Sequence, residues 1–413
     1  MKVGIVGGGI IGYCSAYFLQ KSGHEVTIFE KSKDQDSPSY WNAGMVVPSH
    51  FIPLSSPGVI SKGLRWMFKS DSPFYIKPRL DVDLIKWLWN FKKHATTKHV
   101  EYSVNILRDL NQASNRLFDQ IIEENHLETT KNKGLLMIYN TEKGAREEKT
   151  IAEKANELGV KANLLNLNGL AEIDPAVRYN AKGAVYYPND AFLSPNEFMR
   201  ELESVLIGIG VTIMKGEEVE NFSIQSKRIS RVHTSSKEIE IDQLVLCSGI
   251  NSFLLGRKLG INLPMQGGKG YSVTIPKPST LPGICSILTE AKVTVTPMNA
   301  DLRLAGTMEI SGMDLTIRKN RVNGYLRSVS EYIPEYEYKN LQNYDVWTGL
   351  RPCSPDGLPY IGNTRKFENL VVCTGHSMMG FSMGPISGKL VSELINDSEP
   401  SIELSKLKPE RFK

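Results

Sequence analysis

The 413-residue sequence has no run of 18 apolar residues, no block of basic residues and no cysteine pair at C-x-x-C spacing. The first absence argues against a membrane-spanning helix. The second, together with a formal net charge of only +4, argues against nucleic-acid binding. The five cysteines lie far apart, so we expect neither a locally encoded zinc site nor a dithiol redox pair, and we predict no metal site. Their odd number, and an N-terminus without an apolar signal segment, predict a reduced, cytoplasmic protein.

The chain has the ordinary composition of a globular protein, with 41% hydrophobic and 23% charged residues. Its length exceeds what one small hydrophobic core accommodates, so we expect two domains.

The first 32 residues are typical of a strand, a glycine turn, a helix and a second strand. Gly7, Gly9 and Gly12 satisfy G-x-G-x-x-G directly after the β-branched run at 2–6. In this motif the glycines allow a tight turn, close approach of a pyrophosphate and close helix packing, and the helix N-terminus faces the phosphates. Glu30 ends the second strand, where a carboxylate accepts hydrogen bonds from ribose hydroxyls. The pattern predicts a dinucleotide site, and the motif alone does not choose between FAD and NAD.

Further segments of the same α/β type occur in the middle and at the end of the chain. Ser194 and Glu197 fit a helix capping box, and "LVLCSG" and "NLVVCTG" are strands that end in glycine turns. Between these segments, residues 101–124 fit a long amphipathic helix and residues 269–310 alternate as in an antiparallel sheet. We therefore predict an α/β fold of Rossmann type, combined with an α+β substrate domain that contains a mainly antiparallel sheet.

Both domains are expected to be discontinuous in sequence. The nucleotide-binding domain is predicted to comprise residues 1–75, 193–255 and 345–413. The substrate domain is predicted to comprise residues 76–192 and 256–344.

Residues 60–99 combine aromatic and basic side chains in an unusual density. They hold three of the five tryptophans, with nine Lys or Arg against three Asp. Such a surface suits the headgroup layer of an anionic membrane, which predicts a peripheral contact with the inner membrane face. The alternative is that the tryptophans pack beneath the helix at 101–124 and the lysines are solvated.

Five segments resemble one known family. They are "NAGMVVPSHFIPLSSPGV", "LIKWLWNFKKHATTKH", "KGYSVTI", "WTGLRPCSPDGLPYIGNT" and "NLVVCTGHSMMGFSMGPISGKLVSELI". The chain resembles, nearly end to end, the D-amino-acid oxidase superfamily of FAD proteins, which includes glycine and sarcosine oxidases. Within it, the bacterial D-amino acid dehydrogenases are the most similar. The resemblance implies the two-domain fold of that superfamily and FAD as the cofactor. We expect FAD to be bound non-covalently, because Cys353 lies a few residues from the tethering cysteine of sarcosine oxidases.

The resemblance also implies a substrate site. Arg351 of "GLRP" corresponds to the arginine that binds the substrate carboxylate over the isoalloxazine ring, and a planar guanidinium suits a carboxylate. The alternative is a surface or structural arginine. Tyr271 of "KGYS" is expected either to bind the same carboxylate or to be a half-buried sheet tyrosine. His50 and Phe51 are expected to line the pocket. Met378 stands where some relatives carry a second arginine, so a second carboxylate clamp is absent there.

The turn "CTGHSMMG" resembles the flavin-contacting segment of the family, where backbone N–H groups and the helix dipole stabilise the reduced flavin. We favour a backbone role for His376 over a role as a base, and we assign no catalytic side chain with certainty. The residues expected at the cofactor are Gly7, Gly8, Gly9, Ile10, Ile11, Gly12, Glu30, Lys31, Asn42, Ala43, Gly44, Met45, Val219, Ser248, Gly249, Gly349, Gly375, His376, Met379 and Gly380.

The predicted function is FAD-dependent dehydrogenation of a small amino or imino acid, such as a D-amino acid, D-proline or D-hydroxyproline. Hydride passes from the substrate Cα to flavin N5, and Arg351 contributes mainly by orienting the substrate. A quinone or another carrier is expected to accept the electrons. Two alternatives are a glycine or sarcosine type of oxidase that uses oxygen, and a dinucleotide-binding protein without catalysis.

Overall fold

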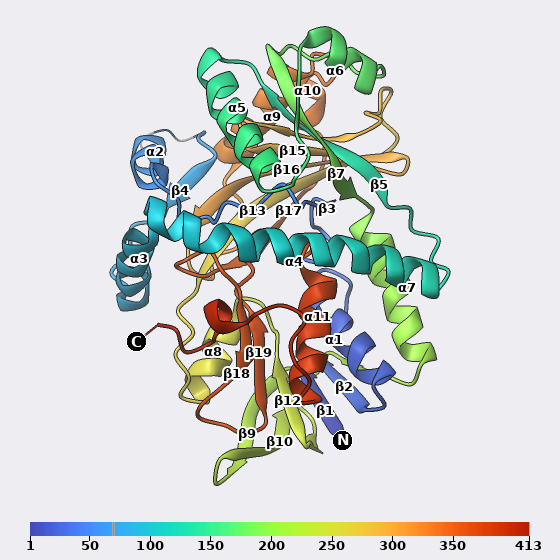
Figure 1. Cartoon of the computed structure of the whole chain (residues 1–413), viewed down its shortest axis with the longest axis vertical. Helices are drawn as coiled ribbons and strands as arrows, with labels where there is room; N and C mark the ends of the chain where they lie inside the picture. The colour runs from blue at the N-terminus through green and yellow to red at the C-terminus, as the bar shows by residue number, and fades with distance from the viewer. Residues whose placement is uncertain (68, 70, 413) are drawn as a thin grey trace.

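The structure is a computed structural model, and it describes residues 1–67, 69 and 71–412. Two β-sheet regions lie one above the other, and the long helix α4 (Thr97–Glu124) crosses between them (Figure 1). The chain passes between the regions several times, so each region is assembled from separate stretches of sequence.

The lower region in Figure 1 contains a six-stranded sheet with the order β18-β19-β12-β1-β2-β8. Its strands are β1 (Lys2–Val6), β2 (Glu25–Glu30), β8 (Thr212–Lys215), β12 (Gln243–Leu246), β18 (Tyr360–Asn363) and β19 (Leu370–Thr374). All pairs are parallel except β18 with β19. The chain builds outward from β1 on one side and then returns to β12 and β19 on the other. Ligands bind at such a reversal, at the carboxyl ends of the strands.

Both faces of this sheet are covered. Helices α1 (Ile10–Lys21) and α11 (Gly384–Ile395) pack together on one face. Gly388 permits their close contact, since a Cβ there would lie 2.3 Å from the carbonyl carbon of Cys14. The other face is covered by α8 (Asn251–Lys258) and by a small sheet of β9 (Val219–Gln225), β10 (Arg228–Thr234) and β11 (Glu238–Glu240).

The upper region contains a ten-stranded sheet. Its main path is β17-β13-β16-β15-β14-β5-β7-β3, with β4 added beside β16 and β6 beside β7. The strands are β3 (Met45–Val46), β4 (Phe74–Ile76), β5 (Asn132–Tyr139), β6 (Asn163–Leu165), β7 (Gly183–Phe192), β13 (Gln266–Ile275), β14 (Cys285–Leu288), β15 (Val293–Met298), β16 (Asp301–Ile310) and β17 (Val346–Cys353). The antiparallel pairing of β13, β15 and β16 confirms the prediction for 269–310.

The remaining helices lie mostly around the upper sheet. They are α2 (Val59–Met67), α3 (Val82–His94), α5 (Glu142–Glu157), α6 (Leu167–Ile173), α9 (Lys319–Tyr332) and α10 (Tyr338–Leu341), while α7 (Pro195–Gly208) and the short 3₁₀ turn η1 (Ser405–Leu407) belong to the lower region. Among the described residues, no helix combines the length and the apolar character that a membrane crossing requires.

Three sequence predictions differ from the observed elements. Residues 45–46, 74–75 and 346–353 were assigned to the nucleotide-binding domain, but they belong to β3, β4 and β17 and pair with β7, β16 and β13 in the upper sheet. The helix predicted at 101–124 begins earlier, at Thr97, because the Thr96 hydroxyl accepts a hydrogen bond from the His99 N–H. The capping box at α7 is wrong: Ser194 makes no side-chain cap, and the Glu197 carboxylate binds the Asn299 amide instead.

Candidate active site

The glycine turn after β1 meets the turn after β12 at the carboxyl edge of the lower sheet. Gly7 has a φ of +115°, and a Cβ there would lie 2.8 Å from the Cys247 oxygen and from Ser248 Cα. A Cβ at Gly12 would lie 1.9 Å from the Gly7 oxygen. Neither position has space for a side chain, so the turn is compact, as a turn that approaches a pyrophosphate closely must be.

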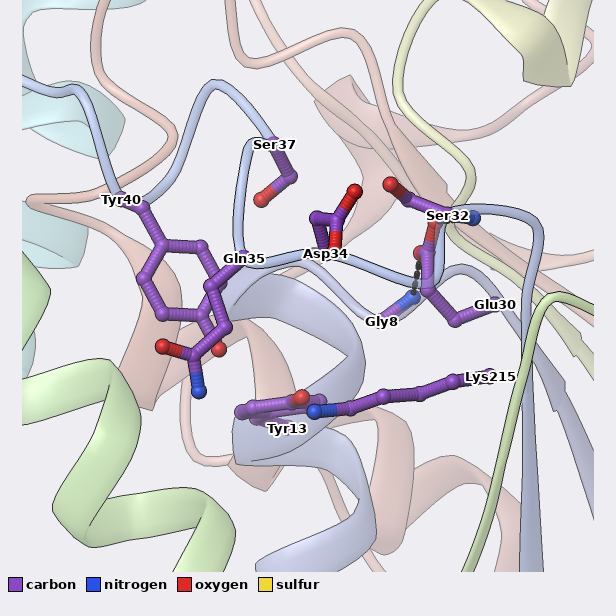
Figure 2. A pocket seen from close by; sticks show the side chains of 9 residues that line it. All are labelled: Gly8, Tyr13, Glu30, Ser32, Asp34, Gln35, Ser37, Tyr40 and Lys215. Atoms are coloured by element: carbon purple, nitrogen blue, oxygen red, sulfur yellow. Dashed lines mark hydrogen bonds between the residues drawn. The ribbon is translucent and has the colours of Figure 1, made fainter.

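Glu30 is held against this turn from β2. Its Oε2 accepts a hydrogen bond from the Gly8 N–H at 2.7 Å, and its Oε1 accepts one from the Ser32 N–H at 2.8 Å. Figure 2 shows the small pocket beside this carboxylate, with Tyr13 and Lys215 on its far side. The carboxylate therefore stands where the sequence motif requires a ribose-binding acid.

Ser39 is a residue of this site that the sequence reading missed. Its hydroxyl accepts a hydrogen bond of 2.9 Å from the Ile10 N–H. This N–H is one of the groups at the start of α1 that have no partner within the helix. Ser39 precedes the predicted flavin-contacting residues 42–45 by only a few positions. The sequence shows only a serine in a loop. It does not show that this loop returns to the N-terminus of α1, so the contact could not be predicted.

The segment 42–45 is fixed by β16 of the upper sheet. Arg303 Nη1 donates to the carbonyl oxygens of Tyr40 and Asn42 at 3.0 and 2.9 Å. Asn42 Oδ1 accepts from the Gly44 N–H at 3.0 Å. Gly44 has a φ of +73°, and a Cβ there would lie 2.2 Å from the Leu193 oxygen. This segment is therefore a rigid link between the two sheets.

The turn that follows β19 approaches the end of β17. His376 forms an isolated β-bridge with Cys353, and the Ser377 N–H donates to the Pro352 oxygen at 3.0 Å. The His376 ring turns inward, and its Nε2 lies 2.9 Å from the Ser387 hydroxyl on α11. Burial lowers the pKa of His376 to about 3, so the ring is neutral. A role through its backbone remains our prediction for this residue.

Arg351 lies on β17, on the same face as a row of glycines. The register pairs Arg351 with Gly268 and Gly349 with Gly270. Its guanidinium occupies the space that a side chain at Gly270 would fill, since a Cβ there would lie 2.2 Å from Nη1. Nη1 donates to the Thr307 oxygen at 3.0 Å and more weakly to the Gly268 oxygen at 3.4 Å. The sequence analysis identified the arginine but not the glycines beside it. We call Gly268, Gly270 and Gly349 the glycine floor.

The charge of Arg351 is not neutralised within the described part of the chain. No carboxylate there lies within 4.0 Å of its guanidinium, and both hydrogen bonds go to carbonyl oxygens. Burial lowers the pKa of Arg351 from its ordinary value, yet an arginine keeps its proton in a protein. The Arg351 side chain is partly buried, and a cation withdrawn from water is costly without an anion, so this arrangement favours an anionic ligand.

The face that carries Arg351 is tied to the lower region at both ends. At one end Trp347 stacks on Trp41, with ring centroids 5.6 Å apart and an interplanar angle of 10°. At the other end is the bridge from Cys353 to the turn after β19. Trp347 also covers Gly349, where a Cβ would lie 2.1 Å from the indole. The Arg351 guanidinium therefore lies on a strand that contacts the lower region on both sides of it, through the tryptophan stack and through the Cys353 bridge.

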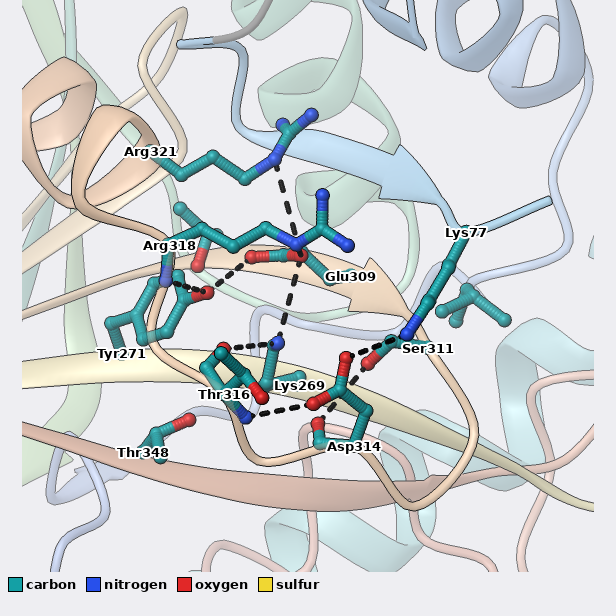
Figure 3. A network of polar contacts seen from close by, with 12 residues as sticks. Lys77, Lys269, Tyr271, Glu309, Ser311, Asp314, Thr316, Arg318, Arg321 and Thr348 are labelled. Carbon is teal, nitrogen blue, oxygen red and sulfur yellow. Dashed lines mark hydrogen bonds and ion pairs between the residues drawn. The ribbon is translucent and has the colours of Figure 1, made fainter.

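Tyr271 points to the face of β13 opposite to the one that Arg351 occupies, which argues against the prediction that it binds the same carboxylate. It follows Gly270 on β13, and successive strand residues point to opposite faces. The Tyr271 hydroxyl donates to Glu309 Oε1 and accepts from the Arg318 N–H at 3.1 Å (Figure 3). This side chain is 1% exposed, so its alternative reading as a sheet tyrosine fits better.

Glu309 is the centre of a buried polar cluster on that opposite face. Its Oε2 lies 3.2 Å from Arg318 Nε, 3.7 Å from Lys269 Nζ and 3.9 Å from Arg321 Nε (Figure 3). Lys269 also donates to the Thr316 oxygen at 2.6 Å. The cluster attaches the chain before α9 to β13 and β16, and so supports the glycine floor from behind.

The other predicted residues lie at different depths. Phe51 is fully buried, and the partly buried His50 contacts the Ser49 hydroxyl. Met378 is 47% exposed in the turn after β19, and Lys31 is exposed directly after β2. The remaining predicted cofactor contacts lie in the turns described above, at the start of α1, or, for Val219, at the buried start of β9. Among residues 1–67, 69 and 71–412 no cluster of three or more His, Cys, Asp or Glu could hold a metal ion.

The fold and the site define a class of flavoenzyme. The chain matches the DAO family model, described as FAD dependent oxidoreductase, over residues 2–394, and it belongs to that family. It is an FAD-dependent oxidoreductase, as the sequence motifs predicted. The glycine turn without space for side chains and the acid at the end of β2 fit the dinucleotide.

Individual relatives and solved structures are similar to this chain over nearly its whole length. A D-amino acid dehydrogenase of Granulibacter bethesdensis is 30% identical over 432 residues, covering 100% of both chains. Among solved structures, glycine oxidase from Geobacillus kaustophilus is similar with a TM-score of 0.79 and 22% identity, covering 100% of this chain and 98% of the other. L-proline dehydrogenase from P. horikoshii has a TM-score of 0.74 and 20% identity, covering 100% and 97%. These two structures confirm the predicted fold.

Proposed function

We propose that the enzyme dehydrogenates a small D-amino or D-imino acid whose carboxylate binds Arg351, with D-proline and D-hydroxyproline as candidate substrates. The observation that carries the proposal is the partly buried Arg351 guanidinium, which has no anionic partner in the described chain. The name of the relatives supports an amino acid of D configuration. The two-domain division into FAD-binding and substrate parts is retained as part of the proposal, with 45–46, 74–75 and 346–353 moved to the substrate part.

The residues contribute mainly by orientation. Arg351 holds the carboxylate. The missing side chains of Gly270 and Gly349 leave the space that the Arg351 guanidinium and Trp347 occupy, so these glycines position the arginine. The stacked Trp41 and Trp347 rings lie at one end of this face. FAD, when bound, supplies the hydride-accepting chemistry at this face. The substrate amine must lose a proton before the hydride leaves Cα, either to solvent before it binds or to a proton acceptor in the site.

The test is an anaerobic titration of the purified protein. We expect a yellow protein whose flavin absorbance is bleached by D-proline or another small D-amino acid, and less by the L-enantiomers, glycine or sarcosine. Reoxidation by a soluble quinone but only slowly by oxygen identifies a dehydrogenase, and rapid peroxide formation identifies an oxidase. A protein without bound flavin, or a flavin that no amino acid reduces, contradicts the proposal.

A second observation favours a membrane surface as the place where electrons are delivered. On α3, Val82, Ile85 and Trp89 are exposed, with Trp89 at 60%, and exposed lysines lie among them. Helix α3 lies at the outer edge of the molecule in Figure 1. In contrast, Trp87 is buried, and its Nε1 donates to the Cys353 oxygen at 2.8 Å. We propose that this outer face of α3, rather than all of 60–99, contacts anionic lipid.

Vesicle co-sedimentation tests this contact. We expect binding to vesicles that contain anionic lipid, weakening as salt is added, and lost when Lys86, Lys92 and Lys93 are all changed to Glu. The matched control reverses three exposed lysines of α5, Lys143, Lys149 and Lys154, and should keep binding much better. Equal loss in both variants would indicate a general effect of net charge, and no binding by the wild type would exclude the contact.

A further inference from the structure

Asp190 is a buried carboxylate without a cation. It lies near the end of β7 and is 0% exposed. Its Oδ1 accepts from the Ser49 N–H at 3.0 Å, and its Oδ2 accepts from the Ser49 hydroxyl at 2.5 Å. In the described part of the chain no Lys, Arg or His nitrogen lies within 4.0 Å of it. Burial raises the pKa of Asp190 to about 7, only partly offset by the serine bonds, so this carboxylate takes up a proton near neutral pH.

His50 continues the hydrogen-bonded chain that starts at Asp190. Its Nδ1 lies 3.1 Å from the Ser49 hydroxyl oxygen. Because the single Ser49 hydroxyl proton points to ionised Asp190, that oxygen accepts from Nδ1–H, and Nε2 then carries the free lone pair. Nε2 has no hydrogen bond to the described part of the protein, and the side chain is only partly buried. The structure thus presents an unused base at the end of an ordered chain of three groups.

The segment 47–57, which carries His50, is hydrogen-bonded to elements of the candidate site on both sides of this residue. At its start, the Val47 N–H donates to the Ser382 hydroxyl at 3.0 Å, close to the turn after β19. At its end, the Ser55 hydroxyl donates to the Asp356 oxygen at 2.7 Å, just beyond the strand that carries Arg351. The segment also follows directly on the predicted flavin contacts at 42–45. His50 therefore lies midway along a segment that connects all three parts of the site.

We propose that His50, Ser49 and Asp190 form a proton relay that receives the proton of the substrate ammonium group, a role that rests on the proposed function. An N–H bond of the substrate breaks as Nε2 of His50 takes the proton, and Nδ1 releases its proton to Ser49 Oγ. Ser49 passes its hydroxyl proton to Asp190 Oδ2. One ammonium and one carboxylate become a neutral amine and a carboxylic acid, with no change in electron count.

The electrostatic setting favours Asp190 over His50 as the place where the proton rests. Burial, and to a lesser degree the charge of Lys292, lower the pKa of His50 to about 4, so a lasting imidazolium is unfavourable. The titratable groups that face Asp190 are Tyr187 on its own strand and Cys285 on β14, and burial raises the pKa of both, so they stay neutral. The relay allows proton transfer without leaving a charge on the imidazole.

The proposal predicts a specific pH dependence of flavin reduction. Only ionised Asp190 can accept a proton, so the rate should rise with pH through a limb near pH 7 that is the same for different amine substrates. Asp190→Asn and Ser49→Ala should each lose this limb and slow reduction by about a hundredfold, within the usual range for general acid–base groups. Ser55→Ala removes another buried hydroxyl from the same segment and should keep the wild-type profile.

A second readout does not depend on activity. In the wild-type holoenzyme, ¹³C NMR of labelled Asp carboxyl groups should show one resonance that titrates near pH 7 and disappears in Asp190→Asn. If Ser49→Ala retains both the limb and the rate of the wild type, or if no such resonance exists, the relay is wrong. If no amino acid reduces the wild-type flavin at any pH while the resonance is present, the proposed function fails and not the hydrogen-bonded chain.

Discussion

Gly270→Ala tests whether the glycine floor sets the position of Arg351. The added Cβ would lie 2.2 Å from Nη1, 2.4 Å from Nη2 and 2.5 Å from Cζ of Arg351. Ordinary contact begins at 3.4 Å, so the guanidinium must move by about 1.2 Å. The strand backbone itself tolerates alanine, because Gly270 has no positive φ. The substitution therefore displaces the arginine while its charge is unchanged.

The expected loss follows from this displacement. A misplacement of about 1 Å in a positioning group can reduce the rate by about a hundredfold. A hundredfold loss corresponds to about 2.7 kcal/mol of transition-state stabilisation. We expect kcat/KM for a carboxylate substrate to fall by this order, with FAD content and the flavin spectrum close to wild type.

Steady-state kinetics with the best substrate and an artificial acceptor measure the effect. Gly306→Ala on the neighbouring strand β16 is the matched control, because its Cβ would meet Val293 at 3.3 Å, a contact that a shift of a few tenths of an ångström relieves. In an Arg351→Ala background, Gly270→Ala should have almost no further effect, since coupled residues are not additive. Near-wild-type kinetics in Gly270→Ala, or full additivity with Arg351→Ala, would refute the reasoning.

Three further predictions concern other parts of the structure. Arg351→Lys should restore little of the loss in Arg351→Ala, which we expect to be between about 30-fold and several thousandfold in kcat/KM, because an ammonium lacks the planar fork. Glu30→Ala should lower FAD retention after gel filtration, whereas Glu25→Ala on the exposed end of the same strand should not. Arg411→Ala should cost about 3–5 kcal/mol in urea unfolding at pH 7, because the buried Asp356 carboxylate loses its partners at 2.6 and 2.9 Å. Burial raises the pKa of Asp356, but Arg411 and the hydrogen bonds hold this pKa below its ordinary value. The stabilisation is therefore present above the unfolded pKa of about 3.9, and it is lost as the pH falls through the folded pKa. An equal cost at pH 3 and pH 7 would count against this account.

The sequence by itself determined the nucleotide end of the protein. A strand, a glycine turn, a helix and an acid at the end of the next strand are local features, and each glycine is required by backbone contacts within that short unit. Periodicity was also sufficient for α4 and for the antiparallel strands of 269–310, because burial on one face imposes a repeat that is visible in sequence. Arg351 was identifiable because its motif is continuous.

Tertiary structure alone decided which side chains meet Arg351. Strand register placed Gly270 beneath the guanidinium and moved Tyr271 to the opposite face, and a difference of one residue along a strand is enough to do so. The stack of Trp41 on Trp347 and the contact between Ser49 and Asp190 join residues that are more than a hundred positions apart. The capping box at Ser194 failed for the same reason, because Glu197 found a stronger partner in a distant turn. Local sequence specifies elements and their turns, whereas the pairing of distant strands determines which faces enclose the substrate.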